Sequence, residues 1–99
     1  SGNYPAEEYY YRSSEEENQD QNEEAKIIDT QEKAEIYIRK TLTDAENNDT
    51  NLGFLGMNGN DFFFRAQSKQ MVANGGTGTV GFYRVSPQGA VRITDAQGN

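Results

Sequence analysis

The first periodic pattern in the chain lies in residues 29–46, where apolar positions recur every three or four residues. This spacing places them on one face of a helix about four turns long. Asp29 with Glu32 three residues later resembles a capping box, and Thr30 is an alternative cap. Residues 35–39 also alternate, and their β-branched isoleucines suit a strand, so a strand stays open as the alternative. The positions on the predicted apolar face are Ala34, Tyr37, Ile38, Thr41, Leu42 and Ala45.

A different pattern follows the polar turn at residues 47–51. Nine of the ten glycines lie between Gly53 and Gly98, and they divide this part into short extended segments. Asn58-Gly59 is a dipeptide typical of tight hairpins. Strands joined by short turns pair antiparallel, so we expect an α+β fold in which one helix packs on a meander of three or four strands. The predicted strands are Leu52 to Met57, Phe62 to Gln70, Thr79 to Ser86 and Ala90 to Asp95.

Alternation within these strands separates two faces of the expected sheet. Phe62, Phe64 and Ala66 point one way, and residues 63, 65 and 67 point the other. Tyr83 and Val85 oppose residues 82 and 84 in the same manner. The pattern does not say which face meets the helix. Basic and aromatic residues of the strands form a candidate interaction surface, which consists of Phe63, Arg65, Phe82, Arg84 and Arg92.

Net charge divides the chain into two parts. The formal charge is −7, and residues 1–24 hold eight acids and one base, whereas the remaining 75 residues are neutral. Residues 13–24 contain no apolar side chain, so nothing offsets the entropy cost of ordering them. We therefore expect a disordered acidic tether at residues 1–25 and a single small α+β domain at residues 26–99.

Composition excludes most kinds of enzyme chemistry. The chain has no cysteine, histidine or tryptophan, which removes disulfides, thiol catalysis, imidazole acid–base chemistry and histidine-bound metals. Only 33% of residues are hydrophobic, so the core must be modest. We expect no catalytic, cofactor-binding or metal-binding residues and no cofactor.

Two short motifs suggest ligands but have the wrong context. Gly76 to Gly81 matches G-x-G-x-x-G, yet a strand rather than a helix is predicted to follow, so we expect a hairpin loop there. The oxygen-rich segment from Asp44 to Asp49 lacks the glycine and glutamate of a calcium loop, which favours a helix end. Nucleic acid is also unexpected, because the acidic leader opposes the release of counterions.

The overall layout carries a resemblance. A leader rich in Gln, Asn and Glu precedes a helix and a meander containing residues 58–64 (NGNDFFF) and 81–89 (GFYRVSPQG). This layout is similar to small extracellular domains of Gram-positive lipoproteins and loosely resembles PepSY-like domains. The resemblance implies an extracellular protein at the cell surface, with a lipid anchor upstream and the leader as a spacer. The chain itself has no cysteine to carry a lipid, and the resemblance supplies no catalytic residue.

Three hypotheses of function follow from these patterns. The first is a non-enzymatic extracellular interaction domain of a lipoprotein or secreted protein, monomeric, which binds a protein, peptide or cell-wall ligand and touches a membrane only through an upstream anchor. The second is a hydrolase that acts on glycans with carboxylates alone. The third is a fragment whose sheet completes that of another domain, with an exposed edge strand and dimers at high concentration.

Overall fold

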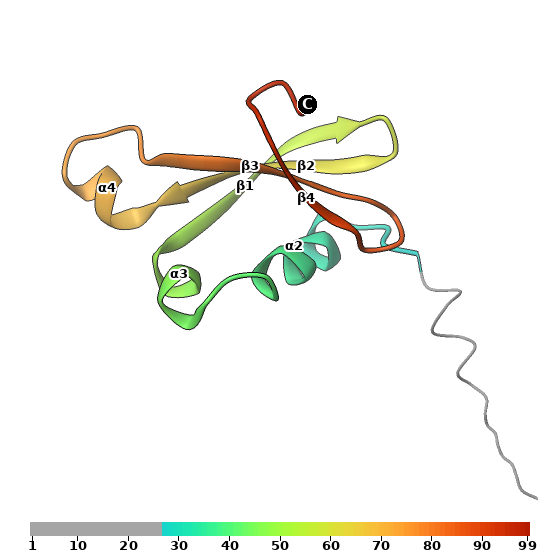
Figure 1. Ribbon diagram of the computed structural model, residues 1–99, viewed down its shortest axis with the longest axis horizontal. Helices are drawn as coiled ribbons and strands as arrows, with labels where there is room; N and C mark the ends of the chain where they lie inside the picture. The colour runs from blue at the N-terminus through green and yellow to red at the C-terminus, as the bar shows by residue number, and fades with distance from the viewer. Residues whose placement is uncertain (1–26) are drawn as a thin grey trace, which may run out of the picture.

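The computed structural model describes residues 27–99, so the predicted tether at residues 1–25 lies outside the described residues. The elements in chain order are α2 (Gln31–Arg39), α3 (Asp44–Asp49), β1 (Thr50–Asn58), β2 (Asp61–Ser68), α4 (Lys69–Ala73), β3 (Thr79–Val85) and β4 (Val91–Thr94). Figure 1 shows the helices α2 and α3 on one side of a sheet, the helix α4 at one end of the sheet, and the last residues of the chain on the other side.

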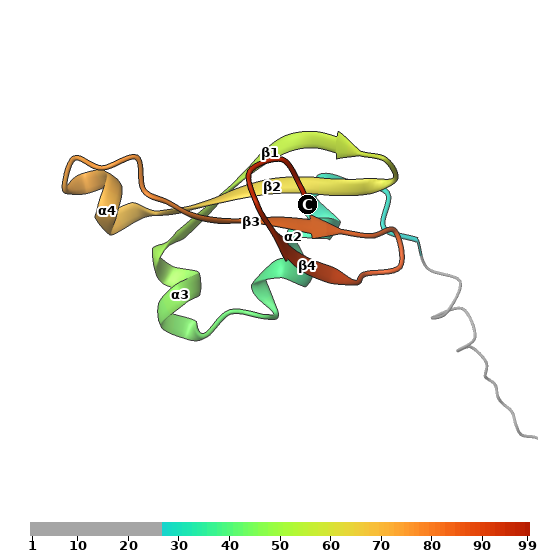
Figure 2. The ribbon, with the colours of Figure 1, turned by 45° about the horizontal axis from the view of Figure 1, so that its top comes forward.

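The four strands form one antiparallel sheet in the order β1-β2-β3-β4, which confirms the predicted meander. Asn58 pairs with Asp61, so the two residues between them make the first hairpin turn. Gly59 has a φ of +61° there, a conformation that glycine adopts without steric cost. Figure 2 shows the strands side by side, with α2 behind the sheet.

The core lies between α2 and one face of the sheet. Residues of β2 alternate strictly between buried and half-buried, and the buried ones include Phe62 and Phe64. Ala34 and Ile38 of α2 are fully buried against this face, as is Val85 of β3. Phe62, Phe64 and Ala66, which the sequence predicts on one face of the sheet, therefore lie on the face that meets the helix.

The prediction of one helix over residues 29–46 is wrong in its extent, because the structure has two shorter helices. α2 ends at Arg39, and α3 begins after Thr43, whose hydroxyl accepts from the Glu46 amide while the Glu46 carboxylate accepts from the Thr43 amide. This reciprocal pair is a capping box, which the sequence Thr-Asp-Ala-Glu encodes. Thr30 caps α2 by accepting from the Lys33 amide. The capping box expected at Asp29 is thus replaced by the alternative cap.

Arg39 holds the two helices and the sheet together where the chain bends. Its guanidinium donates to the backbone and side-chain oxygens of Asn47 and to the carbonyl of Thr50, at 3.1 to 3.3 Å. The Asn47 side chain donates back to the Arg39 carbonyl at 3.0 Å. These bonds satisfy backbone groups that the helix ends leave free.

The second predicted strand is also too long, because β2 ends at Ser68 and a short helix, α4, follows. The Ser68 hydroxyl accepts from the Met71 amide and caps α4. Asp49, at the end of α3, accepts from the Ser68 hydroxyl and from the Gln70 amide. A residue 21 positions from Gln70 thus supports the start of this helix, and local sequence does not reveal this contact.

Replacing Ile38 should test the core directly. Ile38→Ala should lower the free energy of unfolding by about 2–5 kcal/mol and Ile38→Val by about 0.5–1.5 kcal/mol, because both leave space around a side chain with 0% exposure. Ile36→Ala is the matched control on the same helix, at 55% exposure, and should change the value by less than about 0.5 kcal/mol. Urea denaturation measures all three, and equal losses at both positions would contradict this packing.

Candidate functional site

The five residues of the predicted interaction surface all lie on the face of the sheet that α2 does not cover. In the β2–β3 register Phe63 pairs with Arg84 and Arg65 with Phe82, and in the β3–β4 register Arg84 pairs with Arg92. Neighbours across antiparallel strands point to the same side of the sheet. We call this surface, formed by these five residues, the open face.

Phe63 and Phe82 form the apolar centre of the open face. Their ring centroids are 5.9 Å apart and their planes differ by 21°, which is an offset stack. Both residues are half-buried, so part of each side chain remains accessible. Arg65 pairs across the strands with Phe82 and Arg92 pairs with Arg84. Neither Arg65 nor Arg92 forms an ion pair with another residue of the described domain. The open face thus combines two arginines with two stacked rings.

Arg84 has a structural role, unlike the other two arginines of the open face. Its guanidinium forms an ion pair with Asp61 at 2.9 Å, and both side chains are about four-fifths buried, at 19% and 22% exposure. It also donates to the carbonyls of Gly98 at 3.0 Å and Asn58 at 3.2 Å. The donors of Arg84 are therefore engaged within the domain.

The segment Asp95–Asn99, which we call the tail, covers one end of the open face. The Asp95 carboxylate accepts from the amides of Asn99 and Gln97, and these bonds, in that order, lower its pKa. Gly98 is buried with a φ of +87°, and a β-carbon there would collide with the Asn58 side chain. Sequence reasoning missed this cover, although Asp followed by a nearby Gly is a turn signal.

A hollow lies on the opposite side of the sheet, between α3 and strands β3 and β4. It comprises two adjoining cavities of about 270 Å³ each, and both are lined by Leu42, Glu46 and Tyr83. Burial raises the pKa of the Tyr83 hydroxyl, and the negative charge of Glu46 adds to this effect. The Glu46 carboxylate already accepts a hydrogen bond that caps α3. Of the three shared lining residues, Tyr83 therefore contributes a weakly acidic hydroxyl, and the one carboxylate is already engaged.

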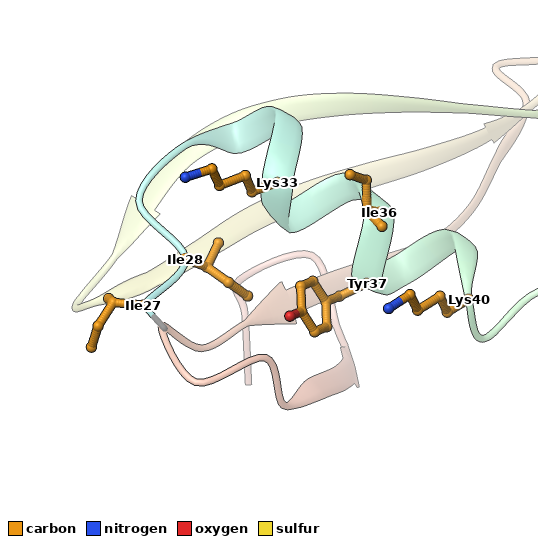
Figure 3. A pocket seen from close by; sticks show the side chains of 6 residues that line it. All are labelled: Ile27, Ile28, Lys33, Ile36, Tyr37 and Lys40. Carbon is orange, nitrogen blue, oxygen red and sulfur yellow. The ribbon is translucent and has the colours of Figure 1, made fainter. Parts of the chain in front are cut away.

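A shallow groove of about 440 Å³ runs along the outer side of α2 (Figure 3). Exposed Ile27 and Ile36 contribute apolar walls, at 58% and 55% exposure. Lys40 lies over the Tyr37 ring, with its nitrogen 4.9 Å from the ring centroid. Lys33, which also lines the groove, is paired with Asp29 at 2.9 Å. The residues of this groove belong to α2 and to the segment before it. The interaction surface predicted from the sequence used strand residues alone, so it missed the groove.

The segment matching G-x-G-x-x-G, from Gly76 to Gly81, forms a loop after α4 and then enters β3. Gly78 is buried, and a β-carbon there would collide with Val72. The glycine is thus required for packing of the loop on α4. Because a strand follows it, this segment lacks the helix start that dinucleotide-binding proteins place against a pyrophosphate.

Within residues 27–99, no group of three or more acidic side chains is arranged to hold a metal ion. No helix in this range is long and apolar enough to cross a membrane. Comparison with protein-family models, curated proteins and solved structures finds no significant match.

Acid titration should reveal the role of Asp49. Hydrogen bonds from the Ser68 hydroxyl and then from the Gln70 amide lower its pKa below the ordinary value of 3.8. A lowered pKa in the folded state adds stability above the unfolded value, and this stability is lost as the pH falls through the folded value. Asp49→Asn should therefore reduce stability at pH 7, and the difference from the wild type should shrink below about pH 3.8. Urea denaturation at several pH values measures this, with Asp44→Asn on the same helix as the control.

Removal of Arg84 should loosen the tail. Arg84→Met should cost about 1–3 kcal/mol, because it leaves Asp61 and two carbonyls without their donor. Arg92→Met removes the same charge from the same face at an exposed position and should change stability by less than about 0.5 kcal/mol. Amide exchange of Gln97 and Asn99 should accelerate only in the first variant. Similar costs for both arginines would refute the structural role of Arg84.

Proposed function

We propose that the domain is a non-enzymatic interaction module that binds its partner through the open face. The observation that carries this proposal is that the stack of Phe63 and Phe82 shares one sheet face with Arg65 and Arg92, and that no described helix covers this face. Arg84 supports this surface from within through its bonds to Asp61 and the tail. Sheets with rings and guanidinium groups on one face offer both apolar contact and charge-assisted hydrogen bonds.

The chemistry of the open face favours a ligand with a flat apolar surface and one or two carboxylates. Aromatic rings contact the apolar side of sugars and of planar side chains, and guanidinium groups bind carboxylates in a bidentate manner. Polyanions such as nucleic acids are disfavoured, because the whole chain carries −7. Cell-wall fragments, which combine sugar rings with few carboxylates, and short peptides with a carboxylate meet these requirements.

We also propose an extracellular location, at the cell surface, for a lipoprotein or secreted protein. What supports it is the resemblance in layout, together with the concentration of net charge in residues 1–24. A chain segment that repels itself extends away from its attachment point, so it would separate the domain from a membrane.

The alternative of a carboxylate-dependent glycan hydrolase receives less support from the described side chains. Such an enzyme needs one carboxyl group with a raised pKa to act as the acid. The pKa shifts of Asp29, Asp49 and Asp95 are all downward, and hydrogen bonds are the main cause of each. Asp61 is committed to Arg84. These engagements favour binding over hydrolysis.

Titration of the ¹⁵N-labelled chain with soluble muropeptides and with a short peptide that ends in a carboxylate tests this proposal. We expect resonances of Phe63, Arg65, Phe82 and Arg92 to shift with at least one of the two probes. The double variant Arg65→Gln/Arg92→Gln should weaken that binding about tenfold or more, because it removes two charge-assisted contacts.

The matched control removes the same charge from the other side of the domain. Lys33→Gln/Lys40→Gln alters the α2 groove and should leave the affinity within about twofold, since these residues do not belong to the open face. Equal weakening by both double variants would indicate a net-charge effect. Shifts confined to the α2 groove, or no shift with either probe, would refute the open face as the binding surface.

A further inference from the structure

The two edges of the sheet differ strongly. β4 has four residues and carries an exposed arginine, Arg92, and short, charged edges resist pairing with other strands. β1 has nine residues, and the whole stretch from Thr50 to Asn60 contains no charged side chain. Three apolar residues of β1 are exposed: Phe54 at 36%, Leu55 at 49% and Met57 at 54%. β1 is therefore the edge that lacks the usual protection.

The outer side of β1 is open over most of its length. Arg39 donates to the carbonyl of Thr50 and Arg84 to the carbonyl of Asn58, so the two ends of the strand are capped. Between these ends, residues 51–57 form no backbone hydrogen bond within residues 27–99 other than those of their own strand ladder. Figure 2 shows no helix beyond β1 at this edge of the sheet. An edge strand presents unpaired N–H and C=O groups in its plane, and these can accept another strand.

We propose that β1 pairs antiparallel with β1 of a second copy of this chain, which joins two four-stranded sheets into one of eight strands. A two-fold axis makes the pairing self-complementary, because each copy presents the same surface to the other. Like charges directly opposite each other destabilise a strand pair, and an uncharged β1 avoids this in every register. The exposed Phe54, Leu55 and Met57 of both copies gain apolar contacts in the pair.

The N-terminal segment of the chain is a poorer occupant for this edge. The described chain starts beside the β3–β4 turn, where the Ile28 amide donates to the Pro87 carbonyl at 2.8 Å. That turn belongs to the far side of the sheet from β1 in the strand order. Residues 1–24 carry a charge of −7, and the stretch from Thr50 to Asn60 offers no cation to attract them.

The bulge in β1 limits the strength of the dimer. The register shifts between Phe54 and Gly56, so Leu55 interrupts the straight edge. Bulges twist an edge and shorten the run that can pair. The contact is also smaller than a standard protein interface, so the chain should be monomeric at about 10 µM and dimeric towards about 1 mM. This inference is independent of the open face, which a pairing of edges leaves accessible.

Sedimentation equilibrium of the full chain between about 10 µM and about 1 mM, in 0.5 M NaCl to screen the acidic residues, tests the pairing. The weight-average mass should rise towards twice the 11.1 kDa of one chain. Amides of residues 51–57 that point away from β2 should exchange more slowly at the high concentration, whereas exchange of the β4 amides should not change. A constant monomer mass would overturn the proposal. Slow exchange of these outward-pointing amides already in the dilute sample would also overturn it, because part of the same chain would then cover β1.

Two matched variants locate the contact. Leu55→Lys places a charge on the β1 edge and should shift the dissociation constant upward at least tenfold. Ile93→Lys places the same charge on β4, at a residue with 75% exposure, and should leave it unchanged. Met57→Lys repeats the first test at a second exposed site, and the ¹H–¹⁵N spectrum confirms that each variant is folded. A dimer that survives both β1 variants, or that Arg65→Gln/Arg92→Gln disrupts, would overturn pairing through β1.

Discussion

The fold depends on the contact between α2 and the buried face of the sheet. Ala34 and Ile38 of the helix belong to one core cluster with Phe62 and Phe64 of β2 and Val85 of β3, and these five residues make up most of the buried apolar side chains. Residues 27–99 provide one such helix for a sheet with two faces, so this contact also decides which face these residues leave open. Stacked rings, arginines and the tail occupy that other face, and the candidate binding surface is thus a direct consequence of where the core lies.

Polar side chains hold the remaining elements in place around this small core. Arg39 joins the two helices to the start of β1, Asp49 accepts hydrogen bonds at the start of α4, and Arg84 secures the tail. Each of these side chains satisfies several backbone groups or side-chain partners at once. In a domain with few buried apolar residues, such bonds define loop conformations that hydrophobic packing alone would leave open.

The open face and the β1 edge are the two surfaces through which we propose association. The open face presents rings and guanidinium groups, which suit a ligand with a flat surface and a carboxylate. The β1 edge presents backbone groups and uncharged apolar side chains, which suit another strand. Because they lie on a face and at an edge of the same sheet, occupancy of one leaves the other accessible. A weak dimer of such a domain would present two open faces together and so increase avidity for a repetitive ligand.

The sequence by itself determined the strands and the two sets of residues on the sheet, because alternation has a period of two and glycine turns separate the segments. It also determined that the chemistry of cysteine and histidine is absent. Only the tertiary structure decided which set meets α2, since Phe62 and Phe63 are equally apolar and differ only in the face they occupy. Asp49 and Arg84 likewise act on groups more than ten positions away, as in the bonds from Asp49 to α4 and from Arg84 to the tail. Periodicity and local capping signals report on neighbours in sequence, whereas these contacts exist only once the helices and strands have packed together.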